Sequence, residues 1–404
     1  MRDLHQIVLF LLIMSVLTGC RVMPGNSHAN PDLIALATTD SEARILFVGD
    51  TSFGETYQSR LKEKGETNIL ESEGYEYTLR GLAPLLDDAH HVVANFETTV
   101  TDLPHTPLSG IKTYLHRANP AKTPTTLKAH HFTTLSLANN HSMDYGSSGL
   151  VDTLTSLDQH GLQYFGAGLN ESEAQRPIHF NLKVSDHEIK VIVASGFESR
   201  TTYRVKYDFY AGPDKPGVNE WSIPKAKEHI RRLRQNAPEA FLIAYPHWGI
   251  NYAAHTEKQT SLAHALIDSG ADLVIGHGSH AIQAIEQYQG CWILYSLGNF
   301  MFNTPGRYAK KDCPPFSLAA MLQITASSTQ PQFTLKLYPI FSDNRITKYQ
   351  PRLVSDEEFF LVRAQLPILA KEEASPRFSY NDAPDQFGSF LRLDVTRRLT
   401  DGLE

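Results

Sequence analysis

The strongest constraint on the fold is a repeated pattern of short apolar runs that each end in small or polar residues. Seven such runs occur in the first 300 residues of this 404-residue chain: RILFVGD (44–50), HVVANFE (91–97), FTTLSLANNH (132–141), EIKVIVASG (188–196), AFLIAYPHWG (240–249), ADLVIGHGSH (271–280) and CWILYSLGNF (291–300). Runs of this length are typical of buried β-strands. We therefore expect them to form a largely buried sheet.

Helical patterns separate several of these runs. Residues 148–160 and 257–269 both carry leucines at helical spacing. Alternation of strands and helices predicts an α/β fold. After residue 315, LAAMLQITA and QFTLKLYPIF indicate a strand pair packed on the main sheet. The stretch from about 355 onward is charged and weakly periodic, which is typical of partial disorder.

The N-terminus has the pattern of a lipoprotein signal peptide. The apolar run IVLFLLIMSVL (7–17) is shorter than the roughly 20 residues that span a bilayer. It leads to LTGC, which resembles the bacterial lipobox, where the cysteine (here Cys20) carries the lipid. A short buried helix is the structural alternative. Arg21 follows the cysteine, and this favours the outer membrane if the cell is Gram-negative.

These features predict a domain plan and a location. We expect a signal peptide over 1–20, a linker over 21–43, one domain over 44–350 and a C-terminal tail over 351–404. The protein is then extracytoplasmic and is anchored to a membrane through its lipid. In an oxidising compartment Cys291 and Cys313 can pair, although two cysteines alone do not decide this.

Polar side chains gather at the predicted strand ends. They comprise two carboxylates, one amide and four imidazoles: Asp50, Glu97, Asn140, His141, His247, His277 and His280. In open α/β sheets this edge is where ligands bind, and this mixture suits zinc, manganese or iron. Each residue also has an ordinary structural explanation, such as a helix cap, a solvated charge or a hydrogen-bonded core histidine. Their shared position favours a metal site.

The stretch LANNHSMDYG (137–146) carries the candidate catalytic group. Asn140 is a candidate ligand, and His141 can protonate a leaving group while Asp144 orients its other ring nitrogen. Arg117, in KTYLHRANP, can hold a substrate carboxylate or phosphate with two hydrogen bonds. A surface salt bridge is the alternative for Arg117.

Several motifs in order resemble the CapA family of capsule and poly-γ-glutamate synthesis proteins. The resemblance runs from about 45 to 305 and rests on GDTSFGE (49–55), NFETTV (95–100), SLANNHSMDYG (136–146), HWGINY (247–252), GADLVIGHGSHAIQAIE (270–286) and YSLGNFMFN (295–303). It implies a fold similar to calcineurin-like metallophosphoesterases. That fold is a four-layered α/β sandwich with a two-metal site at the strand ends, here with a C-terminal β extension.

The resemblance also implies roles for single residues. It implies a first-motif ligand, a bridging carboxylate, an amide ligand, a general acid, a middle histidine ligand and a final histidine pair: Asp50, Glu97, Asn140, His141, His247, and His277 with His280.

This chain departs from the pattern in several places. Metallophosphoesterases carry a histidine where Ser52 stands, and CapA proteins usually carry a glutamate where Asn251 stands. The bridging carboxylate is a glutamate, and the final pair is spaced by two residues, as GHGSH. The site is therefore expected to hold one metal, a second only weakly, or none.

The expected function is a role in making, exporting or anchoring a poly-γ-glutamate-type polymer. Expected partners are the membrane, the anionic glutamyl polymer and a membrane-bound polymer synthase complex. Nucleic acid is not expected, because the net charge is −7 and the pI is about 6.2. The chain has no nucleotide-binding motif, so it is not the ATP-using ligase. A metal-dependent hydrolase of a phosphoester or amide and a non-catalytic polymer-binding scaffold are the alternatives.

Overall fold

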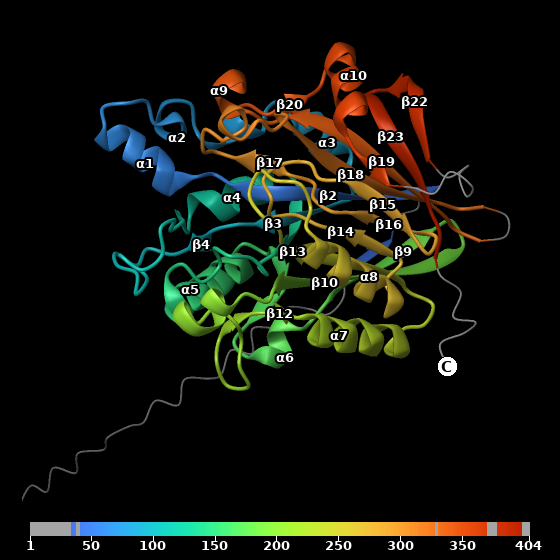
Figure 1. Ribbon diagram of the computed structural model, residues 1–404, viewed down its shortest axis with the longest axis horizontal. Coiled ribbons are helices and arrows are strands. Elements are labelled where there is room, and N and C mark those ends of the chain that lie inside the picture. The colour runs from blue at the N-terminus through green and yellow to red at the C-terminus, as the bar shows by residue number, and fades with distance from the viewer. Residues whose placement is uncertain (1–33, 38–40, 328–329, 370–377, 398–404) are drawn as a thin grey trace, which may run out of the picture.

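The computed structural model describes residues 34–37, 41–327, 330–369 and 378–397 (Figure 1). Most strands in these residues belong to two large mixed sheets. The first sheet contains, in spatial order, β1 (Ile34–Ala37), β9 (Ile178–Val184), β10 (His187–Glu198), β13 (Phe241–His247), β14 (Leu273–Ile275), β16 (Cys291–Leu294), β15 (Ile285–Tyr288) and β21 (Ile368–Leu369), with β12 (Glu220–Trp221) beside β10.

The second sheet is built from the N-terminal and C-terminal parts of the chain. It contains, in spatial order, β22 (Phe378–Asp385), β23 (Gly388–Val395), β19 (Gln332–Phe341), β18 (Phe316–Thr325), β2 (Glu42–Ser52), β3 (His91–Phe96), β6 (Phe132–Ser136) and β7 (Gln163–Phe165), with β17 (Asn299–Phe302) beside β2 and β20 (Arg352–Leu353) beside β19. The predicted strand runs are therefore divided between two sheets.

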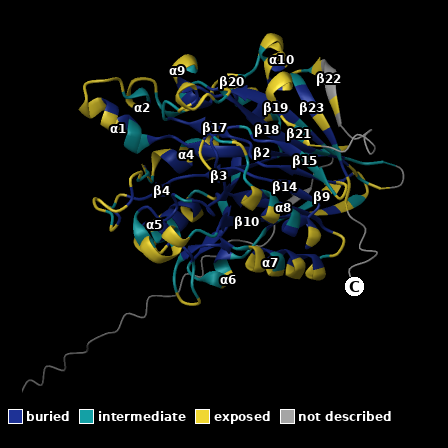
Figure 2. Ribbon diagram, viewed as in Figure 1, coloured by how far each residue is buried: buried dark blue, intermediate teal, exposed yellow. Residues whose placement is uncertain are grey.

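Helices cover the outer face of each sheet, so the order of layers is helix, sheet, sheet, helix. Leucines of α3 (Ala83–Asp88), α4 (Lys122–Ala129) and α5 (Gly146–Gln159) pack on the second sheet. Residues of α7 (Ile223–Asn236) and α8 (Glu257–Asp268) pack on the first. A third apolar layer lies between the sheets. Figure 2 shows these buried layers in dark blue.

The remaining elements are short and lie mainly in the connections. They are α1 (Glu55–Glu63), α2 (Ile69–Ser72), η1 (Tyr75–Leu79), β4 (Thr99–Val100), β5 (Arg117–Ala118), β8 (Ala167–Gly168), α6 (Glu171–Ala174), η2 (Thr202–Lys206), β11 (Gly217–Val218), η3 (Ala309–Lys311), α9 (Asn344–Thr347) and α10 (Asp356–Gln365).

The two helices predicted from leucine spacing are confirmed as α5 and α8. The start of α8 is set by a capping box, in which the Thr256 side chain accepts from the Gln259 N–H and the Gln259 side chain accepts from the Thr256 N–H. Its face toward the sheet is apolar, because Leu262, Leu266 and Ile267 are buried there.

Strand direction places the candidate ligands at corresponding ends of parallel strands. In the second sheet β2, β3, β6 and β7 run parallel, and in the first sheet β10, β13, β14 and β16 do so. Tyr245, from β13, joins the two sheets, because its hydroxyl donates to the Val48 carbonyl of β2. Its ring also lies near Phe47, with centroids 6.0 Å apart, and near His277, at 4.3 Å.

Two expectations about the chain ends need correction. Residues 34–37, placed in the linker, form β1 and pair in parallel with β9. The expected tail contributes β20, α10, β22 and β23, and β23 pairs with β19 across Phe333–Leu337. The physical reason lies in the period-two pattern FLRLDV, which buries Leu391, Leu393 and Val395 in the layer between the sheets.

The remaining expectations concern the N-terminal signal peptide and a disulfide between Cys291 and Cys313. The signal peptide, Cys20 and residues 21–33 lie outside the described residues. Among the described helices, none has the length and apolar character needed to cross a bilayer. Cys291 is buried and Cys313 is half-buried, and no disulfide joins these two described cysteines.

We expect Leu391→Ala to lower the free energy of unfolding by about 2–5 kcal/mol, because it removes a fully buried side chain and leaves a cavity. Leu361→Ala is the matched control, since Leu361 on α10 is 51% exposed and should change stability very little. Urea unfolding of both variants measures the difference. Equal stability of the two would mean that β23 is not part of the folded domain.

Candidate metal centre and proton-transfer group

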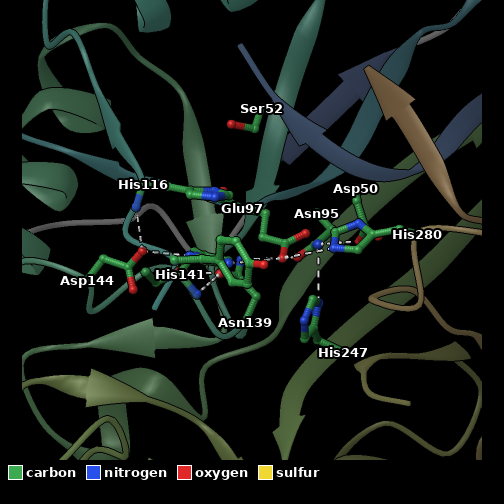
Figure 3. Close-up of polar contacts among 12 residues, drawn as sticks. Asp50, Ser52, Asn95, Glu97, His116, Asn139, His141, Asp144, His247 and His280 are labelled. Carbon is green, nitrogen blue, oxygen red and sulfur yellow. Dashed lines mark hydrogen bonds and ion pairs between the residues drawn. The ribbon is translucent and has the colours of Figure 1, made fainter. Parts of the chain in front are cut away.

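Five of the predicted ligands meet where strands of both sheets end. Asp50 lies near the end of β2 and Glu97 directly follows β3, while His247 ends β13. His277 and His280 follow β14. All five side chains are buried. Figure 3 shows the Glu97 carboxylate between the Asp50–His280 pair and His141.

The five side chains form two groups that share Asp50. In the first group, one ligand atom each of Asp50, His247 and His277 lies within 4.8 Å of the others, and the same holds for Asp50, Glu97 and His280 in the second. The Nδ1 atoms of His247 and His277 are 3.1 Å apart. His280 Nδ1 lies 3.1 Å from Asp50 Oδ2, and His280 Nε2 lies 4.0 Å from Glu97 Oε1.

The charges in this cluster fit a bound cation. Burial and the charge of neighbouring Asp50 raise the pKa of Glu97 well above its usual range. Neither Glu97 oxygen has a hydrogen-bond partner among the described residues. A carboxylate buried in this way is destabilised unless it is paired or coordinates a metal. The donor set of imidazoles and carboxylates suits a divalent ion of the zinc, manganese or iron type.

The imidazoles of the first group are suited to act as ligands. Burial and the nearby His277 lower the pKa of His247 well below its usual range, and burial lowers the pKa of His277 to about 4. Both rings are therefore neutral at pH 7 and keep a lone pair for coordination. His280 differs: burial lowers its pKa, but Glu97 and Asp50 outweigh that effect and raise it to about 9.

Two asparagines that the sequence analysis did not select hold this cluster in place. Asn95 Nδ2 donates to Asp50 Oδ1 at 2.8 Å and lies 3.3 Å from His247 Nδ1. Asn139 Nδ2 donates to Asn95 Oδ1 at 3.1 Å and to the Phe96 carbonyl at 2.8 Å. The signal was present in NFE and NNH, where each asparagine stands one or two residues before a selected side chain.

The neighbouring Asn140 has a different environment. Its Oδ1 is buried and has no hydrogen-bond partner in the described part of the chain. Its side chain also lies within hydrogen-bond reach of Tyr203. The ligand role of Asn140 stays a prediction, and Asn139 is the asparagine that supports the cluster.

Two backbone positions at the cluster require unusual conformations. Gly278 has φ +106°, and a Cβ there would lie 2.8 Å from His247 Cε1. This explains the second glycine of GHGSH, because a residue with a Cβ would not fit there without displacing a candidate ligand. His280 itself adopts φ +61°, which is uncommon for a residue with a side chain and costs conformational energy. Such strain concentrates at functional sites.

The two ring nitrogens of His141 face different carboxylates. Its Nδ1 lies 2.6 Å from Asp144 Oδ2, and its Nε2 lies 3.8 Å from Glu97 Oε1. When Nδ1 carries the proton and donates to Asp144, Nε2 is the nitrogen that faces the cluster. Burial and Lys112 lower the pKa of His141 well below its usual range. The ring is then neutral, so Nε2 must take up a proton before it delivers one to a leaving group.

Lys112 and His116 were not selected from the sequence but belong to this arrangement. The His116 ring stacks on that of His141, with centroids 3.8 Å apart and planes 6° from parallel. His116 Nδ1 lies 3.3 Å from the Glu97 carbonyl oxygen, to which it donates when protonated. Lys112 Nζ lies 2.5 Å from Asp144 Oδ1. Both residues lie in an irregular segment, which carries no periodic signal.

Other predicted residues lie outside the cluster. Arg117 is exposed, its Nη1 donates to the Leu103 carbonyl at 2.8 Å, and its guanidinium lies over the Tyr145 ring. Its role in substrate binding stays a prediction. Ser52 is buried, and its Oγ accepts from the Gly54 N–H at 3.2 Å. Asn251 is exposed.

We expect the purified protein to bind a divalent cation, and His247→Ala to abolish stoichiometric binding because a ligand is lost. Asn95→Ala should weaken the affinity by roughly 10–100-fold, since it removes a group that orients Asp50. Elemental analysis and calorimetric titration with Mn²⁺ or Zn²⁺ measure both effects.

The control for this measurement is His264→Ala. His264 pairs with Glu286 at 2.9 Å, outside the cluster. The His264→Ala variant should therefore keep the metal content of the wild-type protein. Equal metal content in all variants would rule out the cluster as the binding site.

Comparison with known proteins now places the chain. Residues 44–304 match the family model described as "Bacterial capsule synthesis protein PGA_cap". The chain is 30% identical over 266 residues to the PGA biosynthesis protein CapA of Bacillus subtilis (strain 168), which is 66% of this chain and 64% of that protein.

Two further relatives are similar. The capsule biosynthesis protein CapA of Bacillus anthracis is 30% identical over 268 residues, which is 64% of this chain and 59% of that protein. A probable polyglutamine synthesis accessory protein of Mycobacterium tuberculosis (strain CDC 1551 / Oshkosh) is 34% identical over 222 residues, which is 52% of this chain and 55% of that protein. The chain thus spans under two thirds of the length of each relative. The family match covers more than half of the chain and contains every candidate ligand, so this protein belongs to the bacterial capsule synthesis protein family PGA_cap.

Proposed function

We propose that this protein acts in the synthesis, export or anchoring of a poly-γ-glutamate-type polymer outside the cytoplasm. The observation that carries the proposal is the family match over residues 44–304. The names of the relatives, PGA biosynthesis protein and capsule biosynthesis protein, support the same role. The expected polymer synthase complex belongs to this proposal as a partner.

The fold relationship is part of the proposal. Two sheets between two helix layers, with a carboxylate and histidine cluster at the strand ends, support a calcineurin-like sandwich. The C-terminal strands β22 and β23 extend the second sheet beyond that core.

The proposed chemistry is metal-dependent hydrolysis of a phosphoester or amide bond. The residues that would hold the cation are Asp50 with His247 and His277 on one side, and Asp50 with Glu97 and His280 on the other. A divalent cation held there would act as a Lewis acid toward a phosphoryl or carbonyl oxygen of the substrate.

The residues of the chain supply the proton transfer. His141 Nε2 faces the cluster and takes a proton from the attacking group, which it then gives to the leaving atom. Asp144 holds Nδ1 and keeps the ring in one orientation. Because both side chains are buried, bulk water does not compete for these hydrogen bonds.

A non-catalytic polymer-binding role is the second candidate. It is favoured by Ser52, which stands where a metallophosphoesterase histidine is expected and instead caps the turn before α1. Under this reading the fold binds the polymer without cleaving it.

We expect His141→Gln to lower turnover of a γ-linked glutamate oligomer or a phosphodiester by about 10²–10⁴-fold, because general acid–base catalysis contributes that much. Metal content should not change, since His141 is not among the proposed ligands. Product release and oligomer binding by calorimetry are measured on the same samples. Binding of the oligomer without turnover by the wild-type protein would select the scaffold role. Absence of both binding and turnover would refute the proposal.

The proposed lipid anchor depends on Cys20, which follows the apolar run 7–17. We expect Cys20→Ser to abolish incorporation of labelled fatty acid and to move the protein from the membrane fraction to the soluble fraction. The control is Cys313→Ser, which leaves both unchanged because Cys313 lies in the folded domain. Equal labelling of the Cys20→Ser protein would exclude this anchor.

A further inference from the structure

A buried lysine lies directly behind the proton-transfer histidine. The Lys112 side chain is 5% exposed and comes from the loop 101–116, between β4 and β5. Its Nζ donates to Asp144 Oδ1 at 2.5 Å and to the Tyr114 carbonyl at 2.9 Å, and it lies 3.2 Å from His141 Nδ1. The ammonium group therefore faces the hydrogen-bonded side of the imidazole, away from the cluster.

The Asp144 carboxylate is held through both of its oxygens. Oδ1 accepts from Lys112, while Oδ2 accepts from the His116 N–H at 2.6 Å and lies 2.6 Å from His141 Nδ1. The carboxylate cannot rotate without breaking one of these charge-assisted contacts. By holding Oδ1, the Lys112 ammonium thus determines that Oδ2 is the Asp144 oxygen that faces His141 Nδ1.

The same loop also fixes the outer face of the His141 ring. His116 is the last residue of this loop and stacks on His141, and its backbone N–H donates to Asp144 Oδ2. Thr99, in β4 directly before the loop, donates to the His141 carbonyl at 2.8 Å. One loop therefore contacts both the His141 ring, through His116, and the Asp144 carboxylate, through Lys112.

Fold stability alone does not explain a buried pair at this place. Replacing a buried ion pair with packed apolar residues is often neutral or stabilising, so such a pair is weak evidence for a stabilising role. The described residues contain a second buried pair, Arg234 with Asp272, whose exposures are 4% and 0%. That pair lies between α7 and the start of β14 and serves as an internal reference.

We propose that Lys112 is a positioning residue: its ammonium fixes the Asp144 carboxylate so that His141 Nε2 points at Glu97. This inference rests on the proposed proton-transfer role of His141. It assigns to Lys112 an effect on the orientation of a neighbouring ring rather than a contact with substrate.

The test compares Lys112→Met, which removes the charge but keeps the stem, with Asp144→Asn and with the double variant. The readout is the pair of ring-nitrogen resonances of His141 in ¹⁵N-histidine-labelled protein, assigned by their loss in His141→Gln. We expect Lys112→Met and Asp144→Asn to shift both resonances similarly. The double variant should shift them no further than either single change, because the two residues act as one unit.

The control variant is Arg234→Met, which breaks the reference pair and should leave the His141 resonances in place. Lys112→Arg, which keeps the charge, should restore part of the wild-type pattern. Unchanged His141 resonances in a folded Lys112→Met protein would overturn the proposal. So would additive shifts in the double variant.

The same samples separate this inference from the proposed function. Metal content and turnover are measured beside the spectra. Absence of both in the wild type would refute the hydrolase, while the resonances would still decide whether Lys112 positions His141. If Lys112→Met loses turnover with unchanged resonances, Lys112 acts on the substrate and the positioning role is wrong.

Discussion

The carboxylates of Asp50 and Glu97 lie close together in a position that excludes water, and the surrounding architecture depends on keeping them there. Two buried like charges repel each other, and each loses its hydration. Compensation comes from imidazoles on the first sheet, from the amide of Asn95 on the second, and from a site that fits a cation. Because the compensating groups come from both sheets, the two sheets must end at a common edge.

Much of this arrangement follows from the sequence. Buried parallel strands appear as apolar runs, and their exits appear as the polar residues that end those runs, so Asp50, Glu97 and His247 could be selected without coordinates. The helices behind them were also predictable, because their leucines recur at helical spacing. The division of the strands into two sheets could not be predicted. It depends on pairing between β2 and β18, which are more than 250 residues apart in the chain.

The supporting residues were harder to find, for two physical reasons. Lys112 and His116 come from an irregular loop, where no period links a residue to the direction of its side chain. Asn95 and Asn139 lie one or two positions from residues already chosen, and only the hydrogen bonds show which neighbour faces the cluster. The C-terminal strand β23 was missed although its alternation was visible, because charged residues occupy the outward positions.

Tyr245 links two parts of the molecule that are usually considered separately. Its hydroxyl spans from β13 to the carbonyl of Val48, and its ring touches both Phe47 of the layer between the sheets and the imidazole of His277. The spacing between the sheets and the position of His277 are thus linked through one side chain. A substitution that changes the size of an apolar side chain in this layer would therefore move His277 relative to Asp50, although neither candidate ligand is itself altered.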